Sequence, residues 1–418
     1  MFEPTLNETP PRPDRLLLAS MLGLMFFGVA FVYSASMVDE PTGLWQQYQE
    51  SSFREFCRWL LGEVFFRQII WYVLGLGAAA VVCLVDYRSL ARWAMLAYWG
   101  SIGLLVAVLL PFIGSVRFGA RRWINLGFFQ FQPSEFAKLA FILAMAHFLS
   151  RPADELRKPN MFWKAAGLLA LPFLLVMKEP DLGSALVLVP VWVATLLVSG
   201  VPHRFLVRLT AVVGIAAALF LVDVLFAPPG WQIKLQDYQR RRLLVYFDRD
   251  YTSLAPPGAS KAQLEKLEDQ QRQDSYNVRQ ALISVGSGGV TGKGWRQGTQ
   301  NALGYLPRAV AHNDFIFSVI AEESGFVGSL IVLTLYGVVL FVGIRIASQA
   351  RDRLGRLVAV GVVALLFSHV FINIGMNIRL MPVTGVPLPL LSYGGSSVLV
   401  SLIAMGLLHS VHIYRRTY

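Results

Sequence analysis

Apolar stretches of the length that crosses a lipid bilayer recur along this chain and limit what it can fold into. The first, LLLASMLGLMFFGVAFVY, runs from Leu16 to Tyr33, and a helix needs about 20 such residues to span the hydrocarbon core. No small-residue cleavage site follows it, so we expect a retained span rather than a signal peptide. The composition agrees, because 55% of the residues are hydrophobic and only 15% are charged, against about 25% charged in soluble domains.

These stretches predict an all-α polytopic membrane protein with about ten transmembrane helices. We expect a single transmembrane domain over residues 1–418, with an outer loop at 37–67 and a long extracytoplasmic loop at 227–312 between spans seven and eight. The expected spans are Leu16–Tyr33, Ile69–Val85, Trp93–Ile113, Phe131–Leu149, Phe162–Val176, Leu182–Val198, Phe205–Phe226, Phe315–Ile346, Leu357–Ile374 and Val398–His412.

The polar gaps between the spans indicate the orientation. The gaps DYRSLARW, SRPADELRKPNMFWK, VPHRFLVR and RIASQARDRLGR are rich in Lys and Arg, and short basic loops stay on the cytoplasmic side. Both termini are then expected to be cytoplasmic. The segment 227–312 is also basic and falls outside, but loops longer than about 60 residues escape this bias. Within this segment, the polar stretch PPGASKAQLEKLEDQQRQ is expected to be helical after Ser260.

Ionisable residues in or beside the spans are candidates for function, because each costs about 2.5–3.5 kcal/mol at mid-span. The stretch FQPSEFAKLA places Glu135 and Lys138 three residues apart on one helix face, and its Pro-Ser pair suits a helix start. The two form either an internal ion pair or a pair that faces a substrate. Upstream, Arg121 and Arg122 lie next to a Trp, which suits an interfacial anchor or a phosphate site.

Two further clusters lie at expected outer turns. KEPDLGSAL places Lys178, Glu179 and Asp181 between spans five and six, where a solvated hairpin tip is the simpler interpretation. TGVPLPLLSYGGSS, which contains Ser392 and Ser396, opens the last span. A Gly-rich turn before a helix can receive an anion, but a capped re-entrant turn fits it as well.

The stretch AHNDFIFSVIAEESG places three carboxylates near one span. Asp314 stands at the start and could cap the helix. Glu322 and Glu323 lie about 12 Å further along, at a rise of about 1.5 Å per residue. We expect at least one of them to face a polar interior or a partner such as Lys138.

The stretch GSGGVTGKGW resembles a phosphate-binding loop but departs from its spacing. The Walker pattern needs Gly at position 287 and Ser or Thr at 294, where this chain has Ser287 and Gly294. The stretch also falls in an expected outer loop, away from cytoplasmic nucleotide. We therefore reject ATP binding there; the glycines permit a tight turn, and Lys293 is still a usable cation.

In this order, the clusters resemble the SEDS family of polytopic membrane proteins, named for shape, elongation, division and sporulation. The matching pieces are GARRWINLG, FQPSEFAKLA, KEPDLGSAL, ISVGSGGVTGKGWRQGTQ, HNDFIFSVIAEE and GVPLPLLSYGGSS, and they extend from the third expected span to the tenth. GKGWRQGTQ and GVPLPL are more similar to RodA-like members than to FtsW-like members.

The resemblance implies a peptidoglycan glycosyltransferase that acts in cell-wall elongation and so in cell shape. Such enzymes polymerise lipid II, the undecaprenyl-pyrophosphate-linked disaccharide-pentapeptide, into glycan strands on the outer face of the bacterial inner membrane. The implied partners are a class B penicillin-binding protein, which is the transpeptidase, and other membrane proteins of the elongation complex. No nucleic-acid partner is expected.

The family's His-Thr-Asp-Phe motif corresponds to residues 312–315 here, which implies that Asp314 is the essential carboxylate. The approach to this motif differs from the family pattern. LPRAVAHND is two residues longer, Arg308 replaces a glutamate and Asn313 replaces a threonine. A role for that glutamate is therefore not carried over to this chain.

The implied reaction needs a base for the acceptor hydroxyl and cations for the leaving pyrophosphate. Asp314 is the expected general base. The candidates for binding substrate or pyrophosphate are Arg121, Arg122, Glu135, Lys138, Asp181, Lys293, Gln300, Glu322, Ser392 and Ser396. A divalent cation, Mg or Mn, could share the task with Asp314, but the sequence shows no self-contained ligand set and the metal is left unknown.

Two other functions also fit the sequence. A lipid II flippase or transporter has many spans with buried charges, and a non-catalytic scaffold of the cell-wall synthesis complex needs no catalytic acid. Most clusters lie at the outer edge rather than at the midplane, which favours the enzyme.

Overall fold

The structure is a computed structural model that describes residues 13–36, 53–117, 120–127, 129–226, 237–251, 260–306 and 308–415. Each expected span overlaps one of its helices, which are α1 (Arg15–Ser36), α4 (Val64–Leu84), α6 (Ala94–Leu109), α7 (Pro133–Leu149), α9 (Pro159–Lys178), α10 (Leu182–Ser199), α11 (His203–Phe226), α16 (Ile316–Gln349), α17 (Arg353–Asn377) and α18 (Gly395–Tyr414). Seven described helices are long and apolar enough to cross a membrane, and α6 is a shorter apolar helix. The predicted all-α multi-pass membrane protein is confirmed, while the number of crossings stays a prediction.

Further helices and a small sheet lie between these long helices. The helices are α3 (Phe53–Gly62), α5 (Tyr87–Arg92), α8 (Ala153–Leu156), α12 (Asp237–Tyr246), α13 (Lys261–Ser287), α14 (Thr299–Ala302) and α15 (Arg308–Ala311). The strands are β1 (Gly114–Arg117), β2 (Ala120–Asn125) and β3 (Gln130–Phe131), antiparallel in that order. The sequence did not predict this sheet, which leads the chain from α6 into α7.

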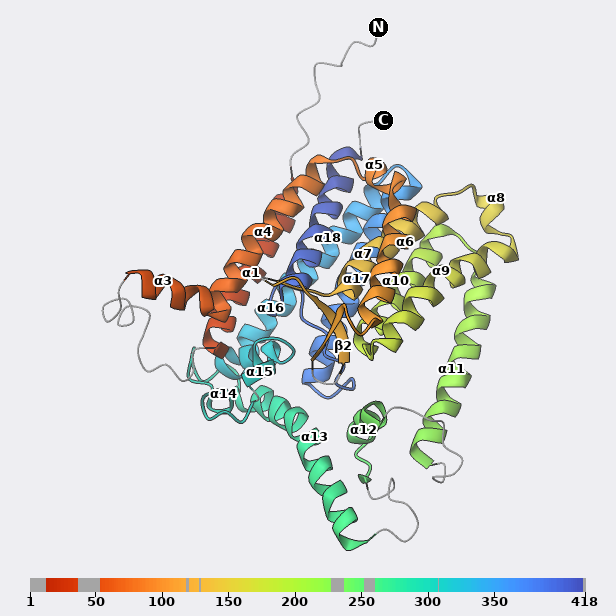
Figure 1. Cartoon of the computed structure of the whole chain (residues 1–418). Helices are drawn as coiled ribbons and strands as arrows, with labels where there is room; N and C mark the ends of the chain where they lie inside the picture. The colour runs from red at the N-terminus through yellow and green to blue at the C-terminus, as the bar shows by residue number, and fades with distance from the viewer. Residues whose placement is uncertain are drawn as a thin grey trace.

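The long helices run side by side, as Figure 1 shows, with α12 and α13 toward one end of the bundle and α5 and α8 toward the other. Helix α7 is buried along nearly its whole length. Helix α17 packs against α7, α10, α16 and α18. The outer helices α4, α6, α9 and α11 expose large apolar side chains, as expected where lipid tails replace a protein neighbour.

The two predicted outer loops contain helices in their described parts. Helix α3 belongs to the first loop, and α12 to α15 belong to the second. A capping box between Ser260 and Gln263 begins α13, which confirms the helix expected after Ser260. Residues 37–52, 227–236, 252–259 and 307 lie outside the described residues, and the limits of the single domain stay a prediction.

The expected eighth span, Phe315–Ile346, is not one continuous helix. Gly325, inside α16, has φ 66° and ψ −160°, which interrupts the helix. The part that follows, residues 326–349, is long enough to cross a bilayer by itself. Glu322 and Glu323 therefore lie in the part of α16 before the break.

A Gly-rich loop, residues 288–294, fills the break in α16. Four backbone hydrogen bonds of 2.9–3.0 Å join the two: Phe326 N to Gly289 O, Val327 N to Val290 O, Lys293 N to Glu322 O, and Gly294 N to Glu323 O. Non-helical backbone inside a membrane bundle needs such partners. Glycine is required where the backbones touch, because a Cβ added at Gly292 would lie 2.2 Å from the carbonyl oxygen of Glu323.

Replacing Gly292 by Ala is expected to destabilise the protein. Its φ is +82° and the added Cβ would collide with backbone, so the free energy of unfolding should fall by about 2 kcal/mol or more. Gly289→Ala is the matched control, because Gly289 also has a positive φ but open space around it and should cost only about 1 kcal/mol. Thermal unfolding of the purified protein in detergent measures both; equal melting temperatures would contradict the proposed backbone collision.

Candidate active site

A Pro-rich segment joins α17 to α18 and is largely buried without being helical. This segment, the α17–α18 loop (residues 378–394), contains three prolines, which have no N–H to donate. Most of its residues from Thr384 to Ser392 are buried. Buried carbonyl groups need hydrogen-bond donors, and here side chains of the surrounding helices supply them.

The donors come from α4, α16 and α17. They are Gln68 to Ser392 O at 3.2 Å, Tyr72 to Leu390 O at 2.7 Å, Tyr336 to Pro389 O, and Asn373 to Val386 O at 2.7 Å. Each of these side chains is itself buried. The loop is therefore held in one conformation by helices that are far from it in sequence.

Asp314 lies in the turn just before α16 and faces this loop. The N-cap position of α16 belongs to Phe315, which has no side-chain cap, so the interpretation of Asp314 as the helix cap is wrong. The carbonyl oxygen of Asp314 accepts from Asn373 at 3.0 Å and from Asn377 at 3.1 Å. Its half-buried carboxylate lies beside Gly385, where an added Cβ would be 3.5 Å from Oδ2.

Ser392 clamps the loop onto the turn that carries Asp314. Its hydroxyl donates to the carbonyl oxygen of Asn313 at 2.6 Å and accepts from Leu388 N at 2.8 Å. Next to it, Tyr393 N donates to His312 O at 2.9 Å. Ser392 thus has internal partners on both sides, and a direct contact with substrate stays a prediction.

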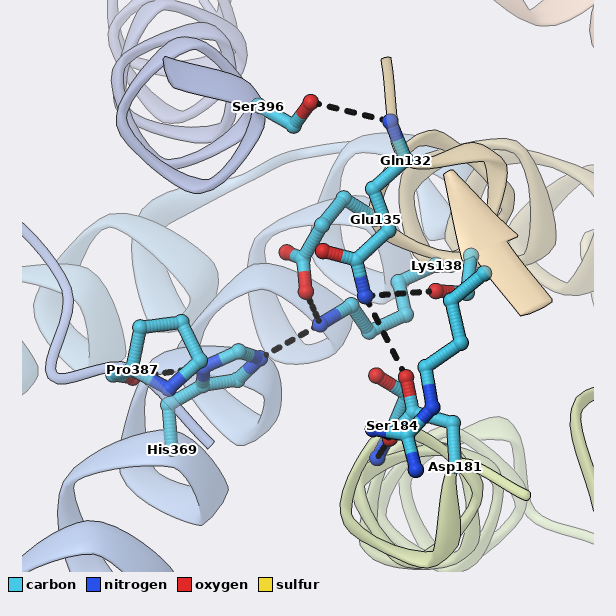
Figure 2. A network of polar contacts seen from close by, with 10 residues as sticks. Gln132, Glu135, Lys138, Asp181, Ser184, His369, Pro387 and Ser396 are labelled. Atoms are coloured by element: carbon cyan, nitrogen blue, oxygen red, sulfur yellow. Dashed lines mark hydrogen bonds and ion pairs between the residues drawn. The ribbon is translucent and has the colours of Figure 1, made fainter. Parts of the chain in front are cut away.

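A buried chain of polar groups links α7 to the same loop (Figure 2). Lys138 Nζ lies 2.8 Å from Glu135 Oε1 and 2.9 Å from His369 Nε2, and His369 Nδ1 lies 3.2 Å from the carbonyl oxygen of Pro387. Glu135 and Lys138 are each only 2% exposed. The structure thus forms the internal ion pair, which was one of the two alternatives, at the start of a helix that begins at Pro133 as expected.

Sequence reasoning missed the polar face of α17. His369, Asn373 and Asn377 recur at intervals of four residues, so they lie on one side of the helix. All three are buried and make the contacts with Lys138, the loop and Asp314 described above. The four-residue spacing of polar side chains within an apolar span was the signal that could have found them.

The turn between α9 and α10 is buried, so its interpretation as a solvated hairpin tip is wrong. Asp181 is 3% exposed and caps α10 by accepting from Ser184 N at 3.1 Å. Gln132 Nε2 donates to the other carboxylate oxygen of Asp181 at 3.2 Å (Figure 2). Gly183 packs on the α17–α18 loop, because a Cβ there would lie 2.8 Å from the carbonyl oxygen of Thr384.

Ser396 joins the start of α18 to the start of α7. Its hydroxyl accepts from Gln132 N at 3.0 Å and donates to Gln130 O at 3.1 Å. The three helix starts at α7, α10 and α18 are therefore tied together through Gln132, as Figure 2 shows.

Arg122 holds the α9–α10 turn and is not a free interfacial anchor. Its guanidinium donates to the carbonyl oxygens of Glu179, at 3.0 Å, and of Pro180, and lies 3.9 Å from Asp181 Oδ1. Arg121 reaches the carbonyl oxygen of Leu109 at 3.4 Å. The hydrogen bonds to the turn use two of the five N–H donors of the Arg122 guanidinium, and a direct contact of Arg122 with a phosphate group stays a prediction.

Glu179 in the same turn is fully buried, and neither carboxyl oxygen has a hydrogen-bond partner among the described residues. Burial raises the pKa of Glu179 to about 9, the charge of Asp181 adds to this, and Arg122 opposes it. Glu179 is therefore protonated at neutral pH.

Glu322 is buried and has a cationic partner, as expected, but the partner is Lys293 rather than Lys138. Its carboxylate lies 2.6 Å from Lys293 Nζ and accepts from Ser284 at 2.9 Å, from Thr299 at 3.0 Å and from Gln300 N at 3.0 Å. These groups belong to the outer loop. Glu322, Lys293 and Gln300 thus form a clamp that fastens this loop to α16.

Glu323 also fastens the outer loop and does not share an interior with Lys138. It accepts from Ser34 of α1 at 2.6 Å and from Arg296 N at 3.1 Å. The carboxylates before the break in α16 therefore have structural partners on α1 and on the outer loop.

The sequence matches a known protein family along nearly its whole length. A sequence profile of the FTSW_RODA_SPOVE family, described as "Cell cycle protein", matches residues 14–417. The chain belongs to this family. Peptidoglycan glycosyltransferase MrdB of Escherichia coli (strain K12) is 38% identical over 405 residues, which cover 96% of this chain and 94% of that protein.

Solved structures of the FtsW/RodA/SpoVE type share the fold. A chain from a structure described as "Structural coordination of polymerization and crosslinking by a peptidoglycan synthase complex" matches with a TM-score of 0.72 and 29% identity, covering 97% of this chain and 99% of that one. The crystal structure of Thermus thermophilus rod shape determining protein RodA matches with a TM-score of 0.61 and 28% identity, covering 97% and 98%.

In this member of the family, the predicted site residues fall into two groups. Asp314, Asp181 and the pair of Glu135 and Lys138 come from three separate motifs and meet around the α17–α18 loop. The groups that clamp the outer loop, Lys293, Gln300 and Glu322, lie together elsewhere.

Replacing Glu179 by Gln is expected to stabilise the protein at neutral and alkaline pH. Between the ordinary pKa of 4.5 and about 9 the folded state keeps a proton that the unfolded state has lost, so stability falls as pH rises through this range. Gln has no carboxyl group to ionise, so the variant avoids this loss of stability. Its free energy of unfolding should be higher than that of wild type by about 1 kcal/mol or more at pH 8, with a smaller gain at pH 5.

Thermal unfolding at both pH values measures this effect. Glu268→Gln, at an exposed position of α13, is the control and should change neither melting temperature. A gain for Glu179→Gln that is the same at pH 5 and pH 8 would contradict a buried, protonated Glu179.

Proposed function

We propose that this protein, a peptidoglycan glycosyltransferase of the FtsW/RodA/SpoVE family, polymerises lipid II into glycan strands during cell-wall elongation, with Asp314 as the general base. The observation that carries the proposal is the placement of Asp314. Its main chain is fixed by Asn373 and Asn377, while its carboxylate is half-buried beside Gly385. A base needs this combination of fixed position and access.

The proposed step is a displacement at the anomeric carbon of a lipid-linked sugar. The 4-hydroxyl oxygen of the acceptor sugar forms the new glycosidic bond, and the bond from the anomeric carbon to the lipid pyrophosphate breaks. Asp314 takes the proton of the hydroxyl, and the electron pair leaves with the pyrophosphate. General base catalysis of this kind contributes about 10²–10⁴-fold.

Lys138 is the best-placed cation for the leaving group among the candidates. An ammonium can donate three hydrogen bonds, and acceptors for two are present among the described residues, Glu135 and His369. The third is available to a substrate oxygen. Arg122 and Lys293 also keep N–H donors that no described residue uses, but their contacts fasten the α9–α10 turn and Glu322, whereas Lys138 is linked through His369 to the loop beside Asp314.

That a divalent cation, Mg or Mn, assists Asp314 stays a proposal. Within the described part of the chain, no group of three or more His, Cys, Asp or Glu side chains could hold a metal ion. These residues do not form a self-contained metal site, so no step is assigned to a metal.

The proposed setting is the bacterial inner membrane, with both termini cytoplasmic and the active site on the outer face. The related chain in the peptidoglycan synthase complex, whose description joins polymerization with crosslinking, supports a class B penicillin-binding protein as the transpeptidase partner. Lipid II and other elongation-complex membrane proteins complete the proposed set of partners.

A lipid II flippase is the second candidate. A buried ion pair on α7 and an interrupted helix at Gly325 are both features of transporters. A flippase moves labelled lipid II to the other leaflet without making polymer, and a non-catalytic scaffold does neither.

Asp314→Asn is expected to lower glycan polymerisation by at least about 100-fold, because the amide cannot take the proton. Purified wild type and variant are supplied with lipid II, and the polymer is resolved by gel electrophoresis. Asp154→Asn, at an exposed position of α8, is the control and should keep full activity.

The same preparations are tested for movement of labelled lipid II between leaflets. Equal polymer from wild type and Asp314→Asn would refute the assignment of the base. Leaflet exchange by wild type without polymer would favour the flippase.

Gly385→Ala is expected to lower polymerisation about tenfold or more, because the methyl group would occupy the space directly beside the Asp314 carboxylate, where the acceptor hydroxyl must be positioned. The added methyl would contact the Asp314 carboxylate and strain a residue with φ +74°. Gly200→Ala is the matched control, because Gly200 has φ +80° and open space at the end of α10. Equal activity of the two variants would contradict the placement of the carboxylate beside residue 385.

A further inference from the structure

His369 occupies a position that the proposed chemistry does not yet use. It is 4% exposed, on the face of α17 that packs against α7. One ring nitrogen meets an ammonium and the other meets a backbone carbonyl, at 2.9 and 3.2 Å (Figure 2). A histidine that only filled space would not need partners of these two kinds.

The two partners fix the tautomer of the ring. An ammonium has only donors, so His369 Nε2 must accept from Lys138 and carries no hydrogen. A carbonyl oxygen only accepts, so Nδ1 carries the hydrogen and donates to Pro387. A protonated ring would direct an N–H at the ammonium, so the neutral Nδ1–H form is the one that fits.

This ring therefore connects the ion pair to the part of the loop that lies beside Asp314. Pro387 is two residues from Gly385, which adjoins the Asp314 carboxylate. One turn further along α17, Asn373 donates to both Val386 O and Asp314 O. The Lys138 ammonium on one side and the main chain of Asp314 on the other are thus held by adjacent turns of one helix.

We propose that His369 is a positioning residue of the polymerisation reaction. It holds the Lys138 ammonium and the α17–α18 loop in fixed positions relative to Asp314. The inference rests on the proposed function. It acts through geometry: Glu135 alone leaves the ammonium free to turn about the ion pair, whereas a second acceptor on α17 sets its direction. The same ring also donates a hydrogen bond to the carbonyl oxygen of Pro387, which ties the loop to α17.

Two substitutions separate positioning from packing. His369→Phe keeps a flat ring of similar size but can neither accept nor donate. His369→Gln keeps an acceptor for Lys138 and a donor for Pro387 on one side chain. If the ring serves only to pack, Phe is the better replacement; if it serves to position, Gln is.

The test uses the full-length protein in detergent with lipid II as substrate. We expect kcat to fall at least about tenfold in His369→Phe with KM for lipid II changed less than about threefold, and His369→Gln to stay within about threefold of wild type. Wild-type kcat in His369→Phe, or equal loss in both variants, would overturn the inference. Asp314→Asn in the same assay reports on the proposed base separately.

A spectroscopic measurement covers the case in which His369→Phe does not fold. Wild-type protein labelled with ¹⁵N-histidine is compared with His369→Gln, so that the difference isolates the signals of His369. At neutral pH we expect a protonated Nδ1 and an unprotonated Nε2. A protonated Nε2, as in the other tautomer or the imidazolium, would overturn the inference whatever the polymerisation assay shows.

Discussion

Every buried backbone polar group inside a membrane-spanning bundle must find a hydrogen-bond partner, because lipid supplies none. Among the described residues, Gly325 in α16 and the α17–α18 loop are two places where buried backbone departs from a helix. Both departures are satisfied by groups far away in sequence. The position of the candidate site depends on the α17–α18 loop, because the Asp314 carboxylate lies beside Gly385 of that loop.

The two departures are satisfied in different ways, for reasons that lie in their residues. At Gly325 the neighbouring loop is rich in glycine, so two backbones approach closely enough to bond directly. The α17–α18 loop is rich in proline, which removes donors and keeps neighbouring backbone at a distance. Long polar side chains such as Tyr72 and Gln68 reach it instead.

The buried ionisable groups described around the α17–α18 loop and the α9–α10 turn are paired or neutral. Lys138 and Glu135 neutralise each other, and the neutral ring of His369 adds a second acceptor without adding charge. Glu179, close to Asp181 and without a hydrogen-bond partner in the described chain, holds a proton because a second buried negative charge there would be too costly. These solutions leave Asp314 as a half-buried carboxylate next to a rigid loop.

The sequence by itself determined the all-α membrane architecture, the family resemblance, the placement of Glu135 and Lys138 on one helix face and the start of α13, because each depends on residue type and on spacing within one segment. It could not determine which segments meet. Glu322 pairs with Lys293 rather than Lys138, the α9–α10 turn is buried, and His369 joins α7 to the loop. Only the tertiary structure decided these points, because contacts between separate segments depend on how the helices pack, and residue spacing within one segment does not specify that packing.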